Sequence, residues 1–165
     1  MTPWHALSLL LHLVALALWL GGIVFFLVVF GPAVRQLTPA TAIKALNQGR
    51  LALEAVSWAG IALLMITGMV NLILRNQETA AHLGQQYMIL MSIKLLLFIA
   101  MLIHHSLQVF KYGPKIVTST FDAGADGTAW PEPLHTHWRK WFTLLKINAA
   151  LGPIAVLLGV ALTKG

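Results

Sequence analysis

The chain has 165 residues, of which 58% are hydrophobic and 10% are charged, and its mean hydropathy is +0.79. This composition excludes a soluble domain and is typical of an integral membrane protein. There is no cysteine, which excludes disulfides, thiolate metal sites and thiol catalysis. The net charge is +6, but it arises from basic residues in loops on one side of the predicted membrane domain, so no nucleic acid partner is expected.

Four apolar segments are each long enough to cross a bilayer as a helix. They are Trp4–Phe30, Leu51–Leu74, Tyr87–Phe110 and Trp141–Leu162. Little chain is left outside them. We therefore expect an all-α fold, a single four-helix transmembrane bundle over residues 1–165 with the lipid bilayer as its main partner. No stretch reads as a convincing repeat of another, so a transporter built from inverted repeats is not expected.

The basic residues are unevenly divided between the two sides of this predicted bundle. Only Arg75 and Lys164 fall on the side that holds both termini. The other side carries Arg35, Lys44, Arg50, Lys111, Lys115, Arg139 and Lys140. Because Lys and Arg accumulate in cytoplasmic loops, the pattern predicts a multi-pass protein of a bacterial-type inner membrane with both termini outside the cytoplasm.

The first span contains His5 and His12 at a spacing that puts both on one narrow helical stripe. His5 lies at the expected headgroup level, as an interfacial residue or a metal ligand. His12 lies roughly 12 Å further in than Trp4 by helical rise, where it requires a ligand, a proton-handling role or a buried hydrogen bond. Gly31-Pro32 is expected to end this span.

Between the first two spans, the sequence predicts a short amphipathic helix of its own, capped at Thr38-Pro39. Glu54 then lies one turn inside the second span. Lys146 has a similar depth in the fourth span, and we expect the two to pair because pairing lowers the cost of holding each charge there.

Lys94 of the third span is expected to face His12 across the bundle. It follows Tyr87 by seven residues, so both basic groups lie roughly 10–12 Å below the outer surface. No Asp or Glu is available at that depth, which predicts a bound group, either a metal on neutral His12 or an anionic haem propionate beside Lys94. Met65 and Met69 of the second span share one helix face and approach the same depth as soft ligands or as simple packing residues.

Four further histidines are expected at the cytoplasmic side. His104 and His105 lie toward the end of the third span, and His135 and His137 precede the fourth. Their predicted common level favours a divalent metal site or haem ligation. The alternative is that the histidine pair only caps its own helix.

The order and spacing of several segments resemble the copper-resistance D family of membrane domains over nearly the whole chain. The resemblance rests on LHLVALALWLGG, ITGMVNLI and YMILMSIKLLLFIAMLI. It implies a four-helix unit for copper transport or homeostasis. The candidate metal ligands are then His5, His12, Met65, Met69, His104, His105, His135 and His137.

The chain also resembles HemJ-type protoporphyrinogen oxidases, which bind haem b. The functional histidine and lysine of that family correspond to His12 and Lys94. Where the family has Arg-Leu-Phe-x-Tyr-His after its Trp-x-x-Gly, this chain has GIVFFLVVFGP. The alternative expectation is therefore a b-type haem protein in electron transfer, or, if an enzyme, a haem-dependent membrane oxidoreductase with Lys94 as catalytic residue.

Besides the lipid bilayer and the copper ion or haem, the expected partners are a redox protein or further copies of the chain. The residues expected to hold the haem are His12, Lys94, His104, His105 and His137.

Overall fold

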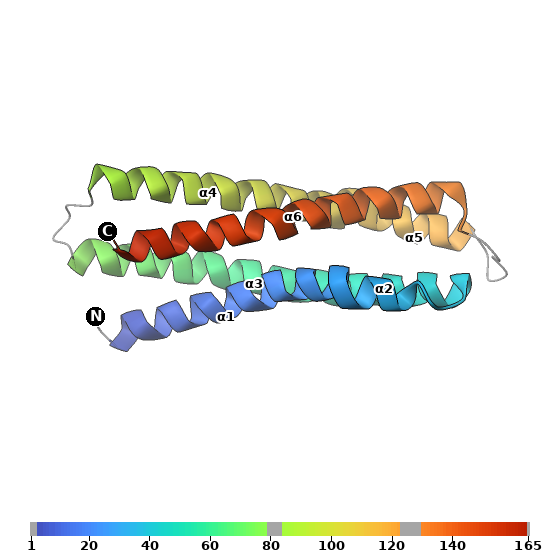
Figure 1. The fold of residues 1–165 in the computed structure, drawn as a ribbon, viewed down its shortest axis with the longest axis horizontal. Helices are drawn as coiled ribbons and strands as arrows, with labels where there is room; N and C mark the ends of the chain where they lie inside the picture. Colours follow the sequence, from blue (N-terminus) through green and yellow to red (C-terminus); the bar gives the residue numbers. More distant parts are fainter. Residues whose placement is uncertain (1–2, 79–83, 123–129, 165) are drawn as a thin grey trace.

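The computed structural model describes residues 3–78, 84–122 and 130–164, and over these ranges it contains helices and no strand. Figure 1 shows long helical rods running side by side along the molecule, with the two chain ends at the same end. Four rods are long and apolar enough to cross a membrane. The predicted all-α four-helix bundle is confirmed.

The first rod is longer than predicted. Helix α1 (Pro3–Phe25) continues through a π-helical segment, η1 (Phe26–Phe30), into α2 (Gly31–Val34). The expectation that Gly31-Pro32 ends the helix is therefore wrong. Pro32 lies at the first positions of α2, where the missing backbone N–H of a proline is tolerated.

The second rod, α3 (Pro39–Glu78), is one unbroken helix of 40 residues. The separate connector helix expected before Leu51 does not exist, because that segment forms the first turns of α3. The expected start at Pro39 is confirmed.

The second half of the chain repeats this order of elements. Helix α4 (Gln85–Ser106) passes through a second π-helical segment, η2 (Leu107–Tyr112), into α5 (Gly113–Asp122). Helix α6 (Glu132–Lys164) then runs back along it, as Figure 1 shows. Each half is thus a helical hairpin, and we call residues 3–78 the first hairpin and residues 85–164 the second.

The two hairpins match at their helix breaks and at several buried positions. In both, the π-helical segment is followed by Gly-Pro, at Gly31 and at Gly113, which differ in number by 82 (113 − 31). The same offset relates buried Trp19, Ile23 and Phe26 to buried Met101, His105 and Gln108. Between α3 and α6 an offset of 91 relates the buried residues Arg50, Glu54, Ser57 and Ile61 to the buried residues Trp141, Leu145, Asn148 and Gly152.

As expected from the sequence, residue identities show no convincing repeat. The correspondence between the hairpins lies in the helix breaks and in part of the burial pattern. Both hairpins begin at the same end of the bundle (Figure 1), so the repeat is parallel and the inverted-repeat transporter plan stays unsupported.

Aromatic rings pack the end of the bundle that lies near the α2–α3 turn. The ring centroids of neighbouring pairs within this cluster are 5.0 to 5.9 Å apart. Such pairs contribute about 0.5–1.5 kcal/mol each beyond the area they bury. The cluster consists of Phe26, Phe30, Trp138, Trp141 and Phe142.

Glu54 pairs with Arg50 and not with Lys146. Arg50 Nη1 lies 2.7 Å from Glu54 Oε1, and both side chains are buried. Lys146 is exposed on α6. The expected pair is wrong because Arg50 belongs to α3 one turn before Glu54, an i,i+4 spacing that brings the two side chains together.

Candidate functional site

His12 is a residue of α1, and its side chain is half-buried against α3. Its Nδ1 is 2.8 Å from the Thr67 hydroxyl oxygen, and Cε1 is 3.5 Å from the point where a Cβ on Gly68 would lie. The ring therefore rests directly on the α3 backbone. Ser8, one turn outward on α1, donates from its hydroxyl to the Thr67 carbonyl at 3.4 Å.

The Thr67 hydroxyl determines which nitrogen of His12 carries the proton. This hydroxyl lies 2.6 Å from the Leu63 carbonyl oxygen, which can only accept, so Thr67 is the donor in that bond. The Thr67 oxygen must then accept from His12, and Nδ1 bears the hydrogen. His12 Nε2 is left with an available lone pair. Metal-binding histidines are oriented in this way by a hydrogen bond at the other ring nitrogen.

Lys94 of α4 lies at the same level as His12. The Trp19 ring lies 6.1 Å from the Phe98 ring and 6.4 Å from the His105 ring, so Trp19 is level with about residue 101 of α4. His12 and Lys94 each lie seven residues before that level. Lys94 is close enough to His12 for their charges to interact. Its Nζ is 3.3 Å from the Cβ position of Gly159 on α6, so all four rods contribute to this level. We call His12, Thr67, Gly68, Lys94 and Gly159 the outer polar layer.

Met65 and Met69 do not belong to this layer. Their side chains are 55% and 67% exposed, whereas Thr67 between them is 4% exposed. Residues two apart on a helix point in nearly opposite directions, so the face that presents Thr67 to His12 turns both methionines outward. Neither is placed to complete a coordination shell with His12. His5, two turns out on α1, lies roughly 10 Å from the His12 level along the helix.

His105 lies deeper and is sealed by aromatic rings. Its side chain is 3% exposed, and its ring centroid is 5.0 Å from that of Trp58 and 6.4 Å from that of Trp19. His105 Nε2 is buried without a hydrogen-bond partner among the described residues, and so is Nδ1 of half-buried His104. Both tryptophans pack edge-to-face with the His105 ring.

The four histidines at the inner side do not share one level. Gln108 Nε2 donates to the Trp141 carbonyl at 3.0 Å, and Asn148 Nδ2 donates to the Met101 carbonyl at 3.1 Å. These bonds set the register of the antiparallel rods and put His137 level with residue 112. His137 and His105 are thus about 10 Å apart along the axis.

Consistently, no group of three or more His, Asp or Glu side chains that could hold a metal ion occurs within residues 3–78, 84–122 and 130–164. The prediction of a common level for the four histidines is wrong because both rods extend well beyond the predicted spans. His135 is exposed and His137 half-buried near the start of α6.

Two buried polar residues, Thr67 and Asn148, were not predicted from the sequence. Thr67 lies two residues from each of the more conspicuous methionines, and its position opposite His12 depends on how α1 and α3 pack. Asn148 lies in the middle of an apolar span. A polar residue in the middle of such a span is a usable signal, since a buried polar group requires a partner.

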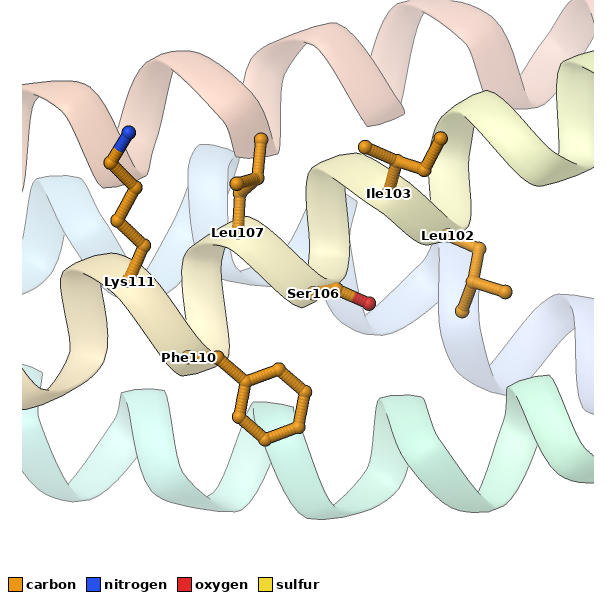
Figure 2. A pocket seen from close by; sticks show the side chains of 6 residues that line it. All are labelled: Leu102, Ile103, Ser106, Leu107, Phe110 and Lys111. Atoms are coloured by element: carbon orange, nitrogen blue, oxygen red, sulfur yellow. The ribbon is translucent and has the colours of Figure 1, made fainter.

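An open, mostly apolar groove runs along the outward face of α4 and η2. Figure 2 shows its lining side chains, which all come from this one stretch of helix. They are Leu102, Ile103, Ser106, Leu107, Phe110 and Lys111. None of these residues belongs to the outer polar layer.

Comparison of the chain with known protein families, curated proteins and solved structures gives no match. The outer polar layer offers one imidazole lone pair, one ammonium group and two glycines between four membrane-spanning rods.

Proposed function

We propose that the chain is a membrane protein that handles a metal centre through His12, in copper transport or homeostasis. The observation that carries the proposal is the hydrogen bond of Nδ1 to Thr67, which holds the ring and leaves Nε2 as a metal ligand. Neutral imidazole suits copper among the ions a protein meets. Of the ligands that the resemblance to the copper-resistance D family implies, His12 is the one that this geometry supports.

A b-type haem is the second candidate, and Lys94 favours it. An ammonium group repels a bare metal cation, whereas it pairs well with a carboxylate. A haem supplies both an iron for the imidazole and propionates for the lysine. On this proposal His12 would ligate the iron and Lys94 would hold a propionate, and the haem would supply one-electron chemistry when bound.

Purification from a host grown with copper and a haem precursor tests both candidates together. We expect metal analysis to find copper or iron bound, and a strong Soret absorption band to accompany iron. The bound metal should be lost in His12→Ala and kept in His135→Ala, a matched change at an exposed histidine. Metal content that is equal in the wild type and folded His12→Ala would refute the proposal.

We further propose that both chain ends lie outside the cytoplasm of a bacterial-type inner membrane. The support is the excess of Lys and Arg at the end of the bundle that holds the α2–α3 turn. Single cysteines can be introduced at Gln86 and Thr118, which are exposed near opposite ends of the α4–α5 rod. A membrane-impermeant thiol reagent added to intact cells should label Gln86→Cys alone, and labelling of Thr118→Cys alone would reverse the orientation.

A further inference from the structure

Four polar atoms in the middle of the bundle have no hydrogen-bond partner among the described residues. Each of the four rods contributes one, and no residue among them is more than 3% exposed. Buried polar atoms in proteins are nearly always hydrogen-bonded, to protein or to ordered water. The atoms are Trp19 Nε1, Ser57 Oγ, His105 Nε2 and Asn148 Oδ1.

Contacts between the rods put these residues at one level. The Trp19 and His105 rings are 6.4 Å apart, which joins α1 to α4. Asn148 Nδ2 donates to the carbonyl of Met101, one turn before His105.

On α3, Ser57 lies between two residues that touch α1 at this level. A Cβ on Gly60 would be 3.2 Å from Trp19 Cβ, and Leu53 Cδ1 is 3.2 Å from the Cβ position of Gly22. Ser57 is therefore level with Trp19.

Ser57 and Asn148 are also equivalent positions of the two hairpins, which differ in number by 91 (148 − 57). Both are fully buried.

We propose that these four residues enclose an internal site that binds water. The donors and acceptors are complementary: a water molecule accepts from the Trp19 indole N–H and donates to Asn148 Oδ1 and His105 Nε2, and the Ser57 hydroxyl bonds in either sense. A bilayer interior supplies no such partner from outside the protein. A metal ion does not suit the same set, because the indole N–H offers a proton and no lone pair.

The water site is separate from the proposed metal centre at His12, and it includes His105, a histidine outside that centre. Bound water gives His105 a proton-exchange partner, although Trp19 and Trp58 close its ring off from the surroundings of the bundle. The site lies between the outer polar layer and the buried Arg50–Glu54 pair.

The direction in which Ser57→Ala shifts the melting temperature distinguishes a site that binds water from a dry one. If water is bound, Ser57→Ala removes one of its partners and the melting temperature falls. If the site is dry, the same change deletes an unpaired buried hydroxyl and the melting temperature is unchanged or rises, which would overturn the proposal. The control is Ser92→Ala, whose exposed hydroxyl bonds the Met88 carbonyl of its own helix and should matter little.

A direct measurement on the wild-type protein decides the same question. In solid-state NMR of the metal-free wild-type protein in lipid bilayers, magnetisation should pass from water protons to the His105 ring and to the Trp19 indole N–H. These signals are identified by their loss in His105→Phe and Trp19→Phe. The transfer should disappear in Ser57→Ala/Asn148→Leu, and its absence from the wild type would refute the proposal.

Discussion

The two hairpins share one scaffold and carry different chemistry at equivalent positions. His12 of the first corresponds to Lys94 of the second, at the offset of 82 that relates the helix breaks (94 − 12). At the offset of 91, the buried Arg50–Glu54 pair corresponds to Trp141 and Leu145.

The corresponding helix breaks and buried positions give both hairpins the same architecture. The site is formed by positions at which the two hairpins carry different residues. Two identical halves would bring two imidazoles or two ammonium groups together in the outer polar layer, and like charges there would repel. A histidine opposite a lysine avoids two fixed cations, since neutral imidazole keeps its lone pair.

The largest expected effect comes from breaking the charge pair that distinguishes the first hairpin. Glu54→Ala leaves the buried Arg50 cation without its partner and should cost about 3–5 kcal/mol in the free energy of unfolding. Arg50→Met/Glu54→Leu makes this position as apolar as in the second hairpin, and its stability should stay within about 1 kcal/mol of the wild type. Chemical unfolding in detergent micelles measures both. Equal losses in the single and double variants would contradict the explanation.

A second difference concerns how closely the two helices of each hairpin approach. A Cβ on Gly60 of α3 would lie 3.2 Å from the Ala15 carbonyl oxygen on α1, whereas the equivalent residue of the second hairpin is Leu151. Gly60→Leu should therefore force α1 away and cost about 1–3 kcal/mol in the same unfolding assay. Gly21→Ala is the control, because nothing lies within 4 Å of its added Cβ. A Gly60→Leu protein as stable as this control would show that the close approach is dispensable.

The smallest expected change in stability is at Thr67, and it is the most informative about the site. Thr67→Val keeps the shape of the side chain and removes the acceptor for His12 Nδ1, which should cost about 0.5–1.5 kcal/mol in unfolding free energy. Without that bond the ring loses its fixed orientation, and metal or haem affinity should fall about 10–100-fold.

Thr143→Val provides the comparison in the second hairpin, since this exposed hydroxyl donates only to the Arg139 carbonyl of its own helix. Titration of both purified variants with copper and with haem measures the effect. Unchanged affinity in Thr67→Val would show that Thr67 does not orient the ligand.

Much of the fold could be predicted because membrane spans are recognised by length and hydropathy alone. The helix ends could not be predicted, since Gly31-Pro32 and Gly113-Pro114 stop helices in water and here continue them beyond a π-helical turn. The predicted start of the second span at Leu51 left Arg50 outside that span, and this hid the partner of Glu54.

The candidate site was predictable only where helical rise determines depth. His12 and Lys94 were assigned a similar depth by counting residues from the outer ends of their spans. Their surroundings depend on which face each helix turns inward, and α3 turns Thr67 inward and Met65 and Met69 outward. Packing against the other rods decides which face of a helix is turned inward. The spacing of residues within one helix does not contain this information.

The length of α3 determines how far the bundle extends beyond the bilayer. Forty residues of helix extend about 60 Å, whereas the hydrocarbon layer is only about 30 Å thick. Roughly half of α3 therefore extends beyond the hydrocarbon layer as a continuous helix. Lys44, near the start of α3, and Lys115 and Lys140 on the neighbouring rods are exposed at this end of the bundle. We therefore expect this end, and not the end that carries His12, to extend beyond the hydrocarbon layer.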